Sequence, residues 1–155
     1  MHTSAAPRWL SAEQQQVWRS YLSAVARIDA FLEDRLRPFG LCMSEYEILV
    51  NLSEAPGRRM RMSELADASR QSRSRLTHAV ARMEEKGLLT RVPCPRDRRG
   101  VIAVLTPRGW DLLDAAAPDH VASVREVLVD AVDPDDFAAL GRAMDAVNRS
   151  LRSCP

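Results

Sequence analysis

Apolar residues in the first part of the chain recur at spacings of three and four, which is the period of an amphipathic α-helix. The series runs from Val17 to Leu36, and Ser11 with Gln14 precedes it at the spacing of a capping box. Pro38-Phe39-Gly40 ends it. Such a helix would span roughly 40 Å, which is long for a domain of this size. We therefore expect it to pack outside its own domain, on a partner subunit.

The middle of the chain alternates short helical and extended patterns. In order, the pattern predicts a helix from Ser44 through about Ser53, an extended stretch over 58–61, a short helix over 62–68, a polar turn over 69–71 and a helix over 73–86. Ser44 with Glu47 forms a second capping box, Ser72 is a good N-cap, and Gly87 is a C-cap residue. Two strand-like runs, 88–93 and 101–106, flank a charged turn over 94–100 and predict a hairpin with a basic tip.

Two further helices are predicted after the hairpin. Thr106-Pro107 begins the first, which runs toward about Asp130, and Pro118 should kink or divide it. Asp133-Pro134 begins the last, whose apolar stripe consists of Phe137, Leu140, Met144, Val147 and Leu151. The order of elements is that of a winged helix-turn-helix. We expect a mainly α fold with a small β-wing, organised as residues 1–40, a winged helix-turn-helix over 41–107, and C-terminal helices over 108–155.

Composition excludes several classes of protein. The 155 residues are 46% hydrophobic and 28% charged, as in ordinary globular domains. No apolar run is long enough to span a membrane and no secretory signal is visible, so we expect a cytoplasmic protein without a membrane partner. Cys42, Cys94 and Cys154 lack paired metal-ligand spacing, and the histidines are scattered, so we expect no metal and no cofactor. We expect no enzyme either, because the chain shows no nucleophile–base set and no glycine-rich phosphate loop.

Charge is distributed unevenly along the chain. Residues 58–99 carry 12 basic and 5 acidic side chains, a net charge of +7, whereas the whole chain carries +1. A compact basic segment attracts polyanions through phosphate contacts and counterion release. The same charges would also suit a solvated, arginine-rich face, so charge alone leaves both interpretations open.

The helix over 73–86 has the residues of a DNA-reading helix. In a winged helix-turn-helix the second helix of the pair enters the major groove, where arginine bonds guanine bidentately and serine or threonine reaches bases or phosphates. The candidate contacts on this helix are Ser72, Arg73, Ser74, Arg75, Thr77, His78 and Arg82, with Ser63 and Arg70 before it. An ordinary surface helix would mix glutamate and lysine, but no acid lies between Ser72 and Met83.

The hairpin tip supplies a second candidate contact. Arg96, Arg98 and Arg99 lie where a wing would follow the duplex, and an arginine that enters a narrow minor groove meets enhanced negative potential. Asp97 is the acid of this tip, and it could fix an arginine by a charge-assisted bond. The alternative is a solvated hairpin turn.

The segment from Met62 to Gly109 resembles the multiple-antibiotic-resistance regulator (MarR) family. The resemblance rests on Ser63-Glu64-Leu65-Ala66, Leu76-Thr77, Arg82 to Leu88, Pro95 to Gly100 and Leu105-Thr106-Pro107-Arg108-Gly109. The most specific part is the wing pattern Asp-x-Arg followed by Leu-Thr-x-x-Gly. The long flanking helices match the layout of the family over nearly the whole chain.

The resemblance implies a homodimer whose terminal helices intertwine, which binds a pseudo-palindromic operator on double-stranded DNA. In that family Asp97 and Arg99 would be the wing aspartate and the minor-groove arginine, and Ser72 to Arg82 the recognition helix. Members typically repress their own or a neighbouring gene, and many release DNA when a small aromatic ligand or an oxidant acts. Trp18, Tyr21 and Met43 are the candidate ligand contacts, although aromatic residues at helical spacing are more often core.

Two other functions remain open at this point. The protein could respond to oxidation of a cysteine, for which Cys42 and Cys94 are the candidates. It could also be an architectural DNA-binding protein that has the basic surface but no sequence preference and no effector.

Overall fold

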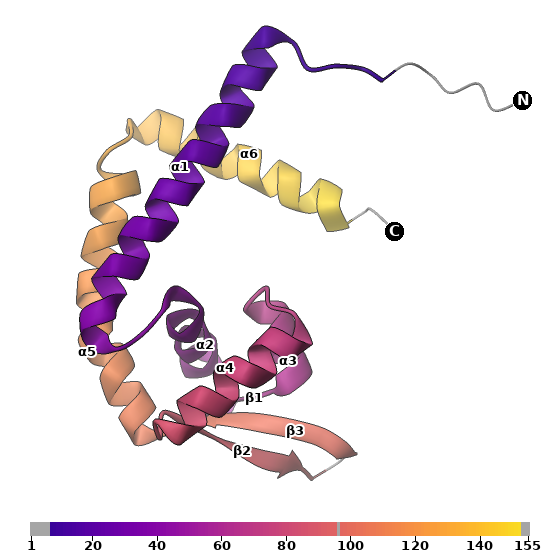
Figure 1. Cartoon of the computed structure of the whole chain (residues 1–155), viewed down its shortest axis with the longest axis vertical. Coiled ribbons are helices and arrows are strands. Elements are labelled where there is room, and N and C mark those ends of the chain that lie inside the picture. The colour runs from indigo at the N-terminus through magenta and orange to yellow at the C-terminus, as the bar shows by residue number, and fades with distance from the viewer. Residues whose placement is uncertain (1–6, 96, 153–155) are drawn as a thin grey trace, which may run out of the picture.

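The computed structural model describes residues 7–95 and 97–152, without the side chain of Arg98. Its elements are α1 (Ala12–Leu36), the 3₁₀ turn η1 (Arg37–Phe39), α2 (Met43–Glu54), the 3₁₀ turn η2 (Pro56–Arg58), β1 (Arg59–Arg61), α3 (Met62–Ala68), α4 (Arg73–Glu85), β2 (Leu89–Cys94), β3 (Asp97–Leu105), α5 (Pro107–Val124), the π-turn η3 (Arg125–Val129) and α6 (Pro134–Arg152). This order confirms the winged helix-turn-helix. In Figure 1, α2, α3, α4 and the sheet form one lobe, and α1, α5 and α6 form the other.

The core lies where α2, α3 and α4 meet the sheet. Helix α2 buries Ile48, Leu49 and Leu52, and α4 buries Leu76, Ala79, Val80 and Met83. These are the apolar sides that the helical spacing predicts, and each fully buried aliphatic side chain contributes about 1.5–3 kcal/mol to stability. The packing therefore leaves the polar side of α4 facing outward.

The sheet is antiparallel with strand order β1-β3-β2. The prediction placed the start of the second hairpin strand at Val101, but β3 begins at Asp97, which pairs with Cys94 after an irregularity between Pro93 and Cys94. Gly100 explains the longer strand: a Cβ there would lie 2.9 Å from the Cβ of Cys94, so only glycine lets the strands approach this closely. The wing is longer and its tip shorter than the sequence suggested.

The N-cap of helix α2 lies two residues earlier than predicted. Its N-cap is Cys42 rather than Ser44, and the Cys42 amide donates to the carboxylate of Glu45 at 3.4 Å. The expected partner, Glu47, instead pairs with Arg70. The predicted spacing between cap and acid was correct, but the pair was shifted by two residues. Cys42 with Glu45 and Ser44 with Glu47 have the same three-residue spacing, so the sequence alone did not distinguish them.

Helix α5 continues through Pro118 to Val124, so the proline does not divide it. Pro118 and Asp114 both lie on the exposed side, where the carbonyl that loses its helical partner faces water. The irregularity comes later, in the π-turn over Arg125–Val129. Helix α6 then runs from Pro134 as expected.

Gly109 lets α5 pack against the turn that follows α4. A Cβ on Gly109 would overlap the carbonyl oxygen of Leu88, and the Thr106 hydroxyl bridges the Gly109 amide (3.0 Å) and the Gly87 carbonyl (2.7 Å). We expect Gly109→Ala to lower the free energy of unfolding by about 2–3 kcal/mol, as overpacking does. Thermal denaturation measures this. Asp114→Ala, exposed on the same helix, should change stability by less than about 0.5 kcal/mol; equal melting of both variants would contradict the account.

A histidine at the α2–α5 contact makes stability depend on pH. The ring of His120 lies against that of Tyr46 with centroids 4.3 Å apart, and His120 Nδ1 is buried with no hydrogen-bond partner among the described residues. Burial lowers the pKa of His120 below its usual value of 6.5. The folded state therefore favours the neutral ring, and this contribution is complete above about pH 6.5 and is lost as the pH falls below it.

The pH effect can be isolated with His120→Phe, which keeps an aromatic ring against Tyr46. We expect the melting temperature of the wild type to fall more between pH 7.5 and pH 5.5 than that of the variant. Carboxylates titrate equally in both proteins, so the difference between the two falls reports His120. Equal falls would show that its protonation does not affect folding.

Candidate nucleic-acid interface

The turn between α3 and α4 is fastened to α2. Ser69 is buried and its hydroxyl accepts from Asn51 Nδ2 at 3.2 Å, and Gln71 Nε2 donates to the Ser44 carbonyl at 3.4 Å. Arg70, with a φ of 51°, pairs with Glu47. This left-handed conformation costs a non-glycine residue about 1–3 kcal/mol, which the surrounding bonds offset. Arg70 is thus exposed but engaged with α2.

Helix α4 is held by its buried side and by a cap at its start. The Ser72 hydroxyl accepts from the Arg75 amide at 3.3 Å, as the sequence predicted. Besides Arg70, the predicted contacts of α3 and the α4 segment that the structure leaves exposed are Ser63, Ser72, Arg73, Ser74, Arg75, Thr77, His78 and Arg82. All but Ser63 belong to the segment from Ser72 to Arg82, which contains no carboxylate, and Glu85 is exposed at the end of α4.

Besides Ser72, two of these exposed side chains have partners. The Thr77 hydroxyl donates to the Arg73 carbonyl at 2.8 Å, one turn back along the helix. Arg82 Nε lies 3.9 Å from a carboxylate oxygen of Glu45, although the arginine side chain is 56% exposed. The remaining arginines of this face, Arg73 and Arg75, extend from the first turn of α4, the end that reads bases in helix-turn-helix proteins.

Glu45 anchors the other end of α4, a role that was not predicted from the sequence. This carboxylate is almost fully buried in α2, and both of its oxygens lie 3.3 Å from Lys86 Nζ. The same ammonium donates to the Gly40 carbonyl at 3.3 Å. A charge removed from water needs such a partner. The pair therefore ties the C-terminal end of α4 to the link between α1 and α2.

The wing carries one described arginine whose charge is directed at solvent. Arg99 is exposed, and its amide donates to Asp97 Oδ1 at 3.0 Å. Asp97 Oδ2 accepts from Arg61 of β1 at 3.4 Å, so the arginine that this aspartate fixes comes from outside the hairpin. Arg96 and the side chain of Arg98 lie outside the described part of the structure. Arg61 was missed because a separation of 36 residues leaves no local signal.

Arg91, on the same hairpin, differs from Arg99 in having a carboxylate partner. Its amide and its Nε each donate to Glu84 at 2.8 Å. The hydrogen bond from the Arg91 backbone amide, and after it the hydrogen bond from the Arg91 guanidinium, hold the pKa of Glu84 below its usual range. The charge of Arg91 is largely offset by this carboxylate, so positive charge on the wing is concentrated nearer the tip.

Comparison with known proteins identifies the family of this chain and matches its whole fold. A profile described as the MarR family matches residues 39–100. AbsC of Streptomyces coelicolor, a MarR family transcriptional regulator, is 47% identical over 95% of this chain and 99% of its own, with a TM-score of 0.91. This chain belongs to the MarR family of transcriptional regulators. Sco3205 of the same organism, solved in complex with DNA, is 44% identical over 94% of this chain and 92% of its own, with a TM-score of 0.91.

A more distant relative is also a transcriptional regulator. The regulator PecS of Dickeya dadantii is 32% identical over 65% of this chain, and the match spans 61% of the length of PecS. These relatives are transcriptional regulators, not enzymes, which fits the expectation that this member of the MarR family is no enzyme. In the part of the chain that the structure describes, no helix is long and apolar enough to cross a membrane, and no cluster of three or more side chains could hold a metal ion.

Of the three predicted ligand contacts of this MarR protein, two lie together in the single chain and Met43 lies apart from them. Trp18 and Tyr21 stack on α1 with ring centroids 5.7 Å apart and are 51% and 42% exposed. Met43 begins α2 and donates its amide to Glu33, which lies about 22 Å along α1 from Trp18. Met43 therefore shares no site with Trp18 and Tyr21 in the single chain.

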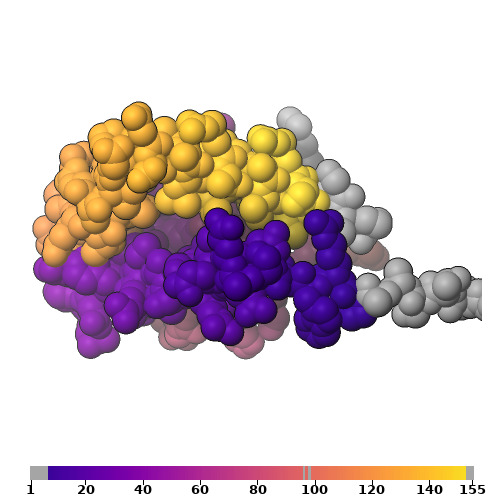
Figure 2. All heavy atoms as spheres, turned by 90° about the horizontal axis from the view of Figure 1, so that it is seen from above, coloured from indigo at the N-terminus to yellow at the C-terminus, as the bar shows by residue number. Residues whose placement is uncertain are grey.

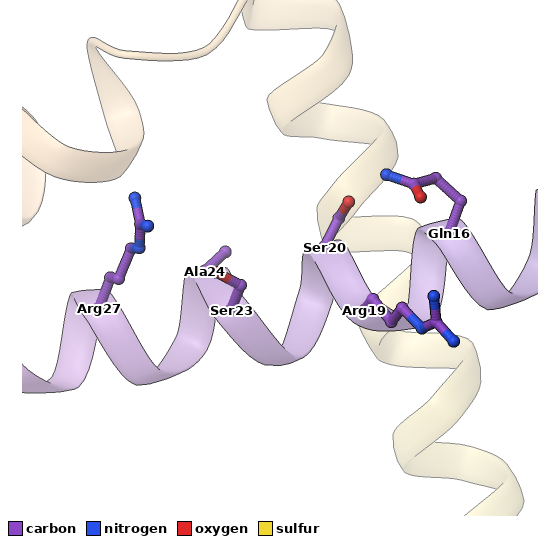
Figure 3. A pocket seen from close by; sticks show the side chains of 6 residues that line it. All are labelled: Gln16, Arg19, Ser20, Ser23, Ala24 and Arg27. Carbon is purple, nitrogen blue, oxygen red and sulfur yellow. The ribbon is translucent and has the colours of Figure 1, made fainter.

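A hollow on α1 is lined by one face of the helix, and five of the six lining residues have polar side chains. Figure 3 shows the side chains that line it, which are Gln16, Arg19, Ser20, Ser23, Ala24 and Arg27. Its volume is about 560 Å³, but a single helix supplies every lining residue. None of the predicted ligand contacts lines it.

The two described cysteines also lack disulfides: Cys94 is buried, and Cys42 is half-buried with its sulfur 3.1 Å from the Ser44 hydroxyl.

Proposed function

We propose that this MarR-family protein is a homodimeric, sequence-specific DNA-binding regulator that represses its own or neighbouring genes. The observation that carries the proposal is the outward face of α4 from Ser72 to Arg82, which presents Arg73, Arg75 and short polar side chains and contains no carboxylate; the exposed Glu85 follows only at the end of the helix. Such a face suits base edges and phosphates in the major groove. In this proposal residues 41–107 bind DNA, and residues 1–40 and 108–155 form the dimer.

The wing supplies the second DNA contact. Arg99 is exposed beside an aspartate that fixes its backbone, and α4 and the hairpin belong to one lobe (Figure 1). While α4 lies in the major groove, we expect Arg99 to enter the adjacent minor groove, where negative potential is enhanced. The DNA complex of the 44% identical Sco3205 supports this use of the fold.

Exposed apolar stripes support the homodimer. Large apolar side chains of α1 and α6 lie open in the single chain, among them Trp18 at 51%, Val147 at 47% and Leu151 at 66% exposure. In α6 no residue is buried, although its apolar residues repeat with helical spacing. Figure 2 shows these two helices at the same end of the molecule. Contiguous apolar surface of this kind marks a protein interface, and a second copy would cover both stripes.

A two-fold dimer implies a matching operator. Two recognition helices related by a two-fold axis read half-sites about 34–36 Å apart, which is one turn of DNA. The operator should therefore be pseudo-palindromic. Such a regulator acts in the cytoplasm, with the DNA. The part of the proposal that concerns a small aromatic effector rests on the exposed, stacked rings of Trp18 and Tyr21, which offer an aromatic surface near the dimer contact.

A footprint on the intergenic DNA beside the gene of this protein tests the proposal. It should be made near physiological salt with excess competitor DNA, because low salt inflates non-specific binding. We expect protection of a discrete pseudo-palindrome. Diffuse protection that disappears with competitor would instead identify an architectural DNA-binding protein.

A further inference from the structure

Arg61 joins the helix-turn-helix to the wing. It is the last residue of β1, and its backbone is also the N-cap of α3, the first helix of the pair. Its side chain leaves the strand toward the hairpin and is 39% exposed. The residue therefore belongs by its backbone to the helix-turn-helix and by its side chain to the wing.

One guanidinium contacts both strands of the hairpin. Nη2 of Arg61 donates to Cys94 Sγ at 3.2 Å, at the end of β2, and Nη1 donates to Asp97 Oδ2 at 3.4 Å, at the start of β3. The planar fork of arginine has donors on separate nitrogens, which lets it serve two acceptors at once. Lysine has a single nitrogen and does not reproduce this bridge.

The same aspartate continues the connection to Arg99. Asp97 Oδ1 accepts from the Arg99 amide, while Oδ2 is held by Arg61. Gly100 makes room for this arrangement, because a Cβ there would lie 3.2 Å from Asp97 Oδ2. The backbone that carries Arg99 is thus fixed through Asp97 to a residue of β1.

We propose that Arg61 is a positioning residue for the wing, which holds Asp97 and through it directs Arg99 toward the DNA. The inference rests on the proposed function, in which Arg99 contacts DNA. A half-exposed ion pair adds little to overall stability. Arg61 therefore acts on the direction of the wing rather than on folding.

A double-mutant cycle on operator affinity tests this role. We expect Arg61→Ala to weaken binding about tenfold with an unchanged melting temperature. If Arg61 acts through Arg99, the double variant Arg61→Ala/Arg99→Ala should bind no more than about twofold more weakly than Arg99→Ala alone. Additive losses would overturn the proposal, because they would mean that Arg61 contacts DNA by itself.

Arg59→Ala is the matched control, because it removes the same charge from an exposed position of the same strand. Its effect, whatever its size, should add to that of Arg99→Ala. If the affinity losses of Arg59→Ala and Arg99→Ala are also non-additive, the positioning role of Arg61 is overturned. The contribution of Arg99 would then depend on any charge lost from β1.

Hydrogen exchange of the Arg99 amide in the free protein gives a readout without DNA. We expect exchange to become at least about fivefold faster in Arg61→Ala and in Arg61→Lys, and to stay unchanged in Arg59→Ala. Unchanged exchange in Arg61→Ala would contradict the proposal. A wild-type protein that shows no sequence preference would instead remove the proposed function, and the exchange result would still report whether Arg61 fixes the wing.

Discussion

Replacing Phe137 and Leu140 by aspartate is expected to convert the dimer to a monomer and to weaken operator binding by about a thousandfold. Both side chains lie on the apolar stripe of α6 and are 37% exposed in the single chain. In the proposed dimer they would be buried, so each aspartate would place an unpaired charge in an apolar interface. A monomer holds one recognition helix and loses the gain from binding two half-sites together.

Sedimentation and operator affinity measure this effect. Ala138→Asp/Ala146→Asp is the matched control, because it adds the same two charges to the opposite side of α6 at 100° per residue. The control should remain a dimer with operator affinity close to that of the wild type. A double-aspartate stripe variant that is folded by circular dichroism, dimeric and fully active would refute the interface.

Arg99→Ala is expected to weaken operator binding roughly tenfold to a hundredfold while leaving the dimer intact. Arg99 is exposed on the wing, and its backbone is fixed by Asp97, so it can enter the minor groove with little further ordering. Losing one such arginine should also reduce the slope of log affinity against log salt concentration by about 1, the value of one phosphate contact. Affinity measured at several salt concentrations tests both effects.

Arg91→Ala is the control for this prediction. It removes the same charge from the same hairpin, but Arg91 is already paired with Glu84 at 2.8 Å. We expect its loss to change affinity by less than about threefold. An unchanged affinity in Arg99→Ala at physiological salt would mean that the wing does not bind as proposed.

The local part of the fold could be predicted from the sequence. Ser11, Ser72 and Thr106 cap the helices that they were expected to cap, because a cap depends on residues three positions apart. The apolar side of α4 was predicted for the same reason, since helical spacing alone decides which positions face the core. The winged order of elements follows from these local patterns.

The connections between elements could not be predicted in this way. Arg61 meets Asp97 across 36 residues, and Arg70 meets Glu47 across 23, so only the folded chain brings them together. The aspartate of the wing was expected to fix an arginine, but the sequence offered nearer candidates than Arg61. The early start of β3 depends on the close approach of Gly100 and Cys94, which is a property of strand pairing rather than of either strand.

The most direct test of the central claim is the ratio of specific to non-specific affinity. The operator would be selected from a random DNA library and compared with a scrambled duplex of equal length, near physiological salt, with the number of chains per duplex measured alongside. We predict a pseudo-palindrome bound by two chains about a thousandfold or more tighter than the scrambled duplex. Equal affinities for the two duplexes would contradict a sequence-specific dimeric regulator.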